Sequence, residues 1–291
     1  MARYSKTAFR VVFNTVVHGV FNGNPAGIEE YIRIASLNKV LLHFLRAARV
    51  EGEIRLREEA RFKLFQARLS EITSALDGLR YVLFKTRKPV VYVPSDIDVL
   101  IDRRHVGRAV ERLRKLGYRI EVAEPYCVTL TRGSTIVDLY VNPTLASTVY
   151  LNGEKLLEYT IEDGVYSVKA PVLSSEAELV VVAAHAVYKE RLYTLNDYAT
   201  LNYLYTPRAR ELARELKVEA AIREALEIHR LVNSELITTP YRIPLAKWTT
   251  LLALKLAGDT QTRATVLNTL KALRDRRFGK LAYSKLTRET Y

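Results

Sequence analysis

The chain has 291 residues, of which 48% are hydrophobic and 26% charged, and this balance is typical of a folded globular protein. Its 45 lysine and arginine residues outnumber 32 acidic ones, and the net charge of +13 favours a polyanionic partner such as RNA, DNA or nucleotide phosphates. The single cysteine, Cys127, excludes an intrachain disulfide and a cysteine-based zinc site, and no apolar run is long enough to span a membrane. We therefore expect a cytoplasmic protein.

The hydrophobic period changes once near residue 80. Residues 26–79 carry apolar side chains at three- and four-residue steps, which predicts helices, the last ended by Gly78. Beyond residue 80 the segments are rich in β-branched and aromatic residues. Strands are expected at residues 80–85, 90–101, 118–123, 127–131 and 134–141, with one helix among them at 104–116. This order predicts a compact α/β unit with a mixed sheet.

The chain becomes helical again from Ser174. Ser174 or Ser175 can cap a helix, with Glu178 in its first turn. Further helices are expected at 207–231, 245–257 and 261–277. The predicted fold class is α+β. Its three parts are an N-terminal helical region at residues 1–79, a small mixed-sheet core at 80–172 and a C-terminal helical domain at 173–291.

Two carboxylates lie two residues apart in an otherwise apolar segment, Tyr92-Val-Pro-Ser-Asp-Ile-Asp-Val-Leu-Ile101. Strand side chains alternate between faces, so Asp96 and Asp98 project on the same side. Buried carboxylates a few ångströms apart repel one another unless a proton or a cation lies between them. A hard divalent cation such as Mg²⁺ takes oxygen ligands, and the pair therefore predicts a metal site.

A third carboxylate, Asp138, lies in another apolar strand, residues 135–141, where a lone buried charge is unfavourable. If this strand lies beside the strand of Asp96 and Asp98, all three carboxylates converge. Such a group can hold two Mg²⁺ ions, which neutralise a triphosphate and activate an attacking hydroxyl.

This constellation resembles the nucleotidyltransferase superfamily with the DNA polymerase β-like fold. In that superfamily a DxD pair on one strand is followed by a helix and a strand, and then by an aspartate on a later strand. Within it, the segments Val82-Leu-Phe-Lys85, Ser95-Asp-Ile-Asp-Val-Leu-Ile101 and Leu116-Gly-Tyr118 are similar to a prokaryotic group of uncharacterised nucleotidyltransferases. The resemblance implies that Asp96, Asp98 and Asp138 are catalytic and bind Mg²⁺ or Mn²⁺. It also implies that Asp138 acts as general base and that the substrate is an NTP such as ATP.

One stretch departs from the superfamily pattern. Most members carry a Gly-Ser or Gly-Gly pair about ten residues before the DxD, where a helix N-terminus binds the triphosphate. Residues 84–89 contain no glycine. Lys85, Arg87 and Lys88 can instead bind phosphate through charge, and Thr86 through its hydroxyl. The other interpretation is that nucleotide binding has changed or been lost.

Two further residues are expected at the nucleotide, Ser95 beside the DxD and Lys189 on a later helix. In the resembling family, helices after the core close over the nucleotide, which would bring Lys189 or Arg191 to the triphosphate. We interpret His185 as a core histidine and Asp102 as a helix cap. The basic C-terminus, residues 271–288, forms a phosphate-binding patch if its charges share a face, and is otherwise a solvated tail.

These observations predict a metal-dependent nucleotidyltransferase that moves an NMP from an NTP to an acceptor hydroxyl and releases pyrophosphate. The basic charge makes RNA the expected acceptor, in particular a tRNA 3′ end, and some relatives of this kind act as toxins of toxin–antitoxin pairs. The alternatives are transfer to a small molecule or a protein, and a catalytically silent RNA-binding relative. The sequence indicates no particular protein partner and no membrane association.

Overall fold

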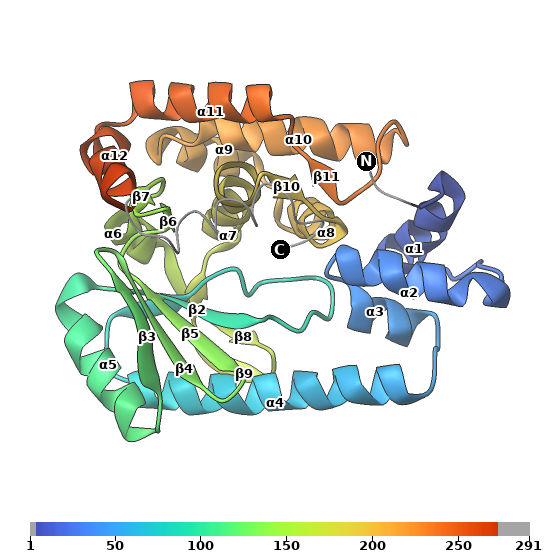
Figure 1. Ribbon diagram of the computed structural model, residues 1–291, viewed down its shortest axis with the longest axis horizontal. Coiled ribbons are helices and arrows are strands. Elements are labelled where there is room, and N and C mark those ends of the chain that lie inside the picture. The colour runs from blue at the N-terminus through green and yellow to red at the C-terminus, as the bar shows by residue number, and fades with distance from the viewer. Residues whose placement is uncertain (1–3, 273–291) are drawn as a thin grey trace.

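Seven strands within residues 4–272, the part of the chain that this computed structural model describes, form one mixed sheet (Figure 1). Their order is β3-β4-β5-β2-β1-β9-β8. The strands are β1 (Tyr81–Leu83), β2 (Asp96–Ile101), β3 (Arg119–Glu124), β4 (Cys127–Arg132), β5 (Thr135–Tyr140), β8 (Thr160–Val165) and β9 (Val168–Leu173). In the centre β2 runs parallel to β5 and antiparallel to β1. The predicted α+β class with a mixed sheet is confirmed.

Two details of the strand prediction are wrong. Residues 90–95 form a loop before β2 instead of the first half of a long strand. Pro89 precedes this loop and Pro94 lies within it, and neither has an amide hydrogen to donate to a sheet, which explains the shorter strand. The hairpin of β8 and β9 was not expected, and β9 joins the sheet beside β1.

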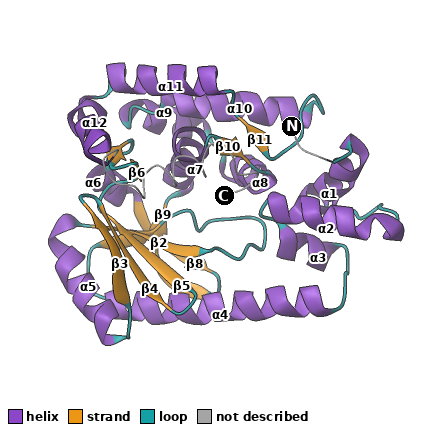
Figure 2. Cartoon of the chain, viewed as in Figure 1, coloured by secondary structure: helices purple, strands orange, loops and turns teal. Residues whose placement is uncertain are grey.

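Most of the helices lie before or after the sheet in sequence, whereas α5 and α6 lie between strands (Figure 2). They are α1 (Lys6–His18), α2 (Ile28–Leu37), α3 (Leu41–Ala47), α4 (Glu53–Leu76), α5 (Val106–Lys115), α6 (Gly153–Leu156), α7 (Ser175–Ala184), α8 (Leu195–Leu204), α9 (Pro207–Glu215), α10 (Glu219–Asn233), α11 (Leu245–Gly258) and α12 (Thr260–Ala272). Short strand pairs are β6 (Thr144–Leu145) with β7 (Thr148–Val149), and β10 (Leu192–Tyr193) with β11 (Tyr241–Arg242).

Local capping explains several of these boundaries. Ser174 caps α7, as predicted, and its hydroxyl accepts from the Ala177 amide. A π-helical turn, His185–Glu190, extends α7. The single helix predicted at 207–231 is two helices, α9 and α10, and Lys217 between them has a left-handed φ of 58°. Residues 273–277 of the last predicted helix lie outside the described residues.

The two faces of the sheet belong to two hydrophobic cores. Leu83 and Val99 pack with α4 and α5, which run along one face (Figure 1). Val82 and Leu100 point the other way, into a larger core formed with helices α1–α3 and α7–α11. Asp98 shares the parity of Leu100 along β2, so its carboxylate points toward the face that the C-terminal helices cover.

Candidate active site

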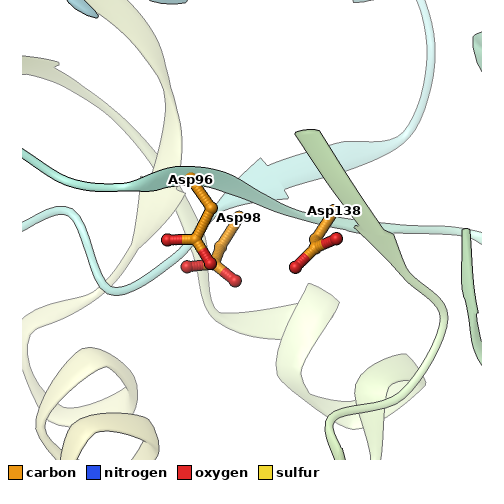
Figure 3. A group of neighbouring side chains, drawn as sticks. All are labelled: Asp96, Asp98 and Asp138. Atoms are coloured by element: carbon orange, nitrogen blue, oxygen red, sulfur yellow. The ribbon is translucent and has the colours of Figure 1, made fainter. Parts of the chain in front are cut away.

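Three carboxylates converge on neighbouring parallel strands. Asp96 and Asp98 lie on β2 and Asp138 on β5, and the register places Asp98 directly opposite Asp138. One carboxylate oxygen from each residue lies within 4.8 Å of the others (Figure 3). The two strands are neighbours, so the condition stated from the sequence for convergence of the three carboxylates is met. The donor set consists of oxygen atoms alone, the ligands that hard divalent cations prefer.

The central carboxylate, Asp98, is paired with a lysine of the glycine-free stretch. Its side chain is buried, and Lys85 Nζ lies 2.7 Å from Oδ2. Burial, together with the charges of Asp96 and Asp138, raises the pKa of Asp98 to about 7 despite the opposing effect of Lys85. Oδ1 of Asp98 is buried without a hydrogen-bond partner among the described residues. This orphaned oxygen, between two further carboxylates, fits a metal ligand.

Asp138 is held by two neighbouring hydroxyls. Thr129 on β4 donates from Oγ1 to Oδ1 of Asp138 at 2.5 Å, and the Tyr140 hydroxyl donates to Oδ2 at 3.2 Å. Lys189 Nζ in turn donates to the Tyr140 hydroxyl at 3.1 Å. The carboxylate of Asp138 therefore has a fixed orientation. Lys189 is linked to it through the Tyr140 hydroxyl.

Asp96 has three lysines within electrostatic range. Burial raises its pKa, but the charges of Lys85, Lys189 and Lys39 outweigh burial and leave the pKa below its usual range. The hydroxyl of Ser95 donates to Oδ1 of Asp96 at 3.2 Å. Ser95 is exposed, and its contact is with the carboxylate beside it.

A cavity of about 220 Å³ opens beside Asp96 and Asp98. Four of its described lining residues are lysines, namely Lys39, Lys85, Lys88 and Lys189. The cavity is also lined by Thr86, Tyr92, Ser95, His185 and Glu190. The predicted nucleotide-binding residues Lys85, Thr86, Ser95 and Lys189 thus share one cavity with two of the three aspartates. A larger cavity of about 430 Å³ lies between β8 and α9, away from the carboxylates. Size alone therefore does not mark the site.

The glycine-free stretch adopts a conformation that glycine usually provides. Lys85 has a left-handed φ of 61°. The fully buried carboxylate of Glu178 on α7 accepts from the amides of Lys85 and Arg87, each at 2.9 Å. Glu178 was expected only as a first-turn residue of α7, and its hydrogen bonds to a distant loop give no signal in the sequence.

Lys39 and Tyr92 are the cavity residues that sequence reasoning missed. Lys39 lies between α2 and α3 in the N-terminal region, and its ammonium stands 5.6 Å from the centre of the Tyr92 ring. The lysine is far from the DxD in sequence and belongs to no motif. Only the packing of the helices brings it to the site.

Of the remaining candidates, which are Asp102, His185 and the basic C-terminus, the first two are not part of the carboxylate cluster. Asp102 caps the short helical turn Arg103–His105 by accepting from the Arg104 amide, which confirms the predicted cap. His185 is buried, and its Nε2 lies 3.4 Å from Oε1 of Glu190. The basic residues predicted to form a patch from 273 onward lie outside the described part of the chain.

Residues 93–233, just under half of the chain, match the family described as uncharacterised nucleotidyltransferase. The predicted resemblance is therefore confirmed, and by class the protein is a transferase of nucleotidyl groups. The matched region contains all three aspartates and Lys189, whereas Lys39, Lys85 and Lys88 precede it.

Two solved structures of ANT(2″)-Ia are similar to part of the chain. The crystal structure with adenylyl-2″-tobramycin is 13% identical, covers 55% of this chain and 98% of its own, and has a TM-score of 0.41. The solution structure of this antibiotic-resistance factor is 17% identical, covers 57% and 96%, and has a TM-score of 0.37. Neither likeness is close enough to carry an argument. No curated protein matches the chain.

None of the helices in the described residues is long and apolar enough to cross a membrane.

Proposed function

We propose that the protein transfers an NMP from an NTP to a hydroxyl of an RNA acceptor and releases pyrophosphate. The observation that carries this proposal is the convergence of Asp96, Asp98 and Asp138 beside a cavity lined by lysines. The carboxylates suit a divalent cation, and the lysines suit the phosphates of a nucleotide.

Asp96, Asp98 and Asp138 would hold the divalent ion, for which we propose Mg²⁺ or Mn²⁺. When bound, such an ion neutralises phosphate charge and lowers the pKa of a coordinated hydroxyl. The orphaned Oδ1 of Asp98 and the all-oxygen donor set support this assignment.

In the proposed reaction, Asp138 accepts the proton of the acceptor hydroxyl. The hydroxyl oxygen forms a bond to the α-phosphorus of the NTP while the bond from that phosphorus to the bridging oxygen breaks, and pyrophosphate leaves. The hydrogen bonds of Thr129 and Tyr140 orient the carboxylate of Asp138 for this step. Lys85, Thr86, Ser95 and Lys189 are proposed to contact the nucleotide, because they line the cavity.

The acceptor is proposed from charge. A net charge of +13 favours a polyanion, and we propose RNA, with a tRNA 3′ end as the specific candidate. A toxin role would follow if that modification blocked translation. A small molecule or a protein is the alternative acceptor, and a silent RNA-binding relative is the non-catalytic alternative.

One labelling experiment separates these acceptors. The protein is incubated with each α-³²P-labelled NTP, Mg²⁺ and total RNA, and the products are resolved into RNA, protein and small-molecule fractions. We expect label in RNA, with the main band at the size of tRNA. Label confined to protein or to small molecules would replace the RNA acceptor, and RNA binding without label would favour the silent relative.

Asp98→Asn is the variant that tests the site in this assay, because asparagine keeps the shape and removes the charge. Asp77→Asn is the matched control, since Asp77 is exposed at the end of α4. The proposal requires label with the control and none with Asp98→Asn. Full activity of Asp98→Asn would contradict it.

A further inference from the structure

Two amides of the glycine-free stretch already have partners inside the protein. Both carboxylate oxygens of Glu178 are occupied by the amides of Lys85 and Arg87. A backbone amide that donates to a buried carboxylate does not bind a phosphate oxygen at the same time. A polyphosphate in this cavity therefore cannot use these two amides, and the side chains that line the cavity are the donors to consider.

Hydrogen bonds of the turn between α2 and α3 hold Lys39 at the cavity. The turn that carries it has Asn38 fully buried, with Oδ1 accepting from the Leu195 amide at 2.9 Å and the side-chain nitrogen donating to Thr239. The Lys39 carbonyl accepts from the Asn196 side chain at 2.9 Å. These bonds hold the α2–α3 turn against the start of α8. Within this turn, Lys39 has a left-handed φ of 57°.

The lysine side chain lies along the ring of Tyr92 and within electrostatic range of Asp96, Lys85 and Lys88. Lys88 lines the same cavity from the glycine-free stretch. Burial lowers the pKa of both lysines, the positive charge of Lys85 lowers both further, and the charge of Lys88 also lowers the pKa of Lys39. An anion bound between them would offset this repulsion.

The buried hydroxyl of Thr86 is a third polar group in the cavity of Lys39 and Lys88. Thr86 is 9% exposed, and its Oγ1 has no hydrogen-bond partner among the described residues. Thr86 lines the cavity together with Lys88. A buried polar atom without a partner in the protein is costly, and a ligand oxygen would satisfy it.

We propose that Lys39 and Lys88, with the Thr86 hydroxyl, bind the polyphosphate of the nucleotide through their side chains, so that the N-terminal helical region forms part of the nucleotide site. Glu178 is the positioning residue that holds the loop carrying Thr86 and Lys88. This inference rests on the proposed nucleotidyl transfer and adds a lysine that precedes the matched family region.

The test compares the binding of two probes in the presence of Mg²⁺. Titration calorimetry measures the affinity for a non-hydrolysable NTP analogue and for the corresponding NMP. The subsite predicts that Lys39→Gln and Lys88→Gln each weaken the NTP analogue about tenfold, the size of one hydrogen bond to a charged group, and leave NMP affinity unchanged. Lys39→Arg keeps the charge and should restore most of the loss.

Lys63→Gln is the matched control, because Lys63 is exposed on α4 and lies outside the cavity. Unchanged preference for the triphosphate in Lys39→Gln would overturn the subsite, as would an equal loss for both probes. Because this readout is binding, it is separate from transfer. A protein without transfer activity but with the lysine-dependent preference would refute the proposed function and keep the subsite.

Discussion

Lys85 Nζ lies 2.7 Å from Oδ2 of Asp98, and both groups are largely buried. The carboxylate cluster thus contains an internal cation. Asp98 and Asp96 raise the pKa of Lys85 above its usual range despite its burial, so this cation stays charged. A lysine and a divalent ion at the same carboxylate share one role, because each reduces the repulsion among the three aspartates.

Replacement of Lys85 by Met should therefore make the fold depend on metal. Without the lysine, Asp98 is a buried charge between like charges, and we expect a loss of about 3 kcal/mol in the free energy of unfolding when EDTA is present. Added Mg²⁺ should return more stability to the variant than to the wild type. Urea unfolding with EDTA and with Mg²⁺ measures both values. Equal metal effects in the two proteins would show that Lys85 does not act as the counter-ion.

Thr129 should affect the rate of transfer through the orientation of Asp138. Thr129→Val removes the 2.5 Å hydrogen bond to Oδ1 but keeps the shape of the side chain. We expect kcat to fall about tenfold, which corresponds to one hydrogen bond, with little change in KM for the NTP. Thr129→Ser restores the hydroxyl and should restore the rate. Steady-state kinetics test this, and a loss that serine does not restore would contradict the orienting role.

Glu178→Gln should loosen the glycine-free stretch. A glutamine side chain has a single acceptor oxygen, so one of the amides of Lys85 and Arg87 would be left without a partner. A buried amide in this state lowers the free energy of unfolding by about 2 kcal/mol. Urea unfolding measures the loss, and Glu176→Gln is the control in the same turn of α7. Equal stability of the two variants would show that the hydrogen bonds to Glu178 do not stabilise this stretch.

The partly buried His229 predicts how stability depends on pH. His229 stacks on Tyr198 with ring centres 4.1 Å apart, and burial lowers its pKa below 6.5. The unfolded chain then binds a proton more tightly than the folded chain, so this contribution to stability is lost as the pH falls below about 6.5. His229→Phe keeps the stacking and removes the titration. The difference in unfolding free energy between pH 7.5 and 5.5 should be smaller in this variant.

His18→Gln provides the control for that measurement, because His18 is exposed at the end of α1. It should show the same pH dependence as the wild type. If His229→Phe also follows the wild type, proton binding at His229 does not contribute.

The sequence allowed the carboxylate cluster to be predicted because its residues stand out in short local segments. Asp96, Asp98 and Asp138 stand out as charges in apolar strands, and strand parity directs the first two to one face. These two signals come from short segments and need no knowledge of distant packing. The adjacency of β2 and β5 was stated only as a condition for convergence, and the structure meets that condition.

Part of the proposed phosphate-binding end could not be predicted, because it depends on tertiary contacts. Glu178 looks like an ordinary residue in the first turn of a helix, yet it binds a loop far away in sequence. Lys39 follows a helix that shows only an amphipathic pattern. The hairpin β8–β9 was missed because Glu162, Asp163 and Gly164 interrupt the apolar alternation of β8, which lies at the edge of the sheet.

The hydrogen bonds of Asn38 have a consequence for how the protein is assembled. They join the turn after α2 to the start of α8 and to Thr239, and the surrounding apolar residues form one shared core. Helices from the two ends of the described chain therefore make a single body, and the sheet is an insertion between its halves. We expect the amides of α2 and α8 to exchange with deuterium in the same cooperative opening. A fragment that begins at β1 would lack the α1–α3 part of that body.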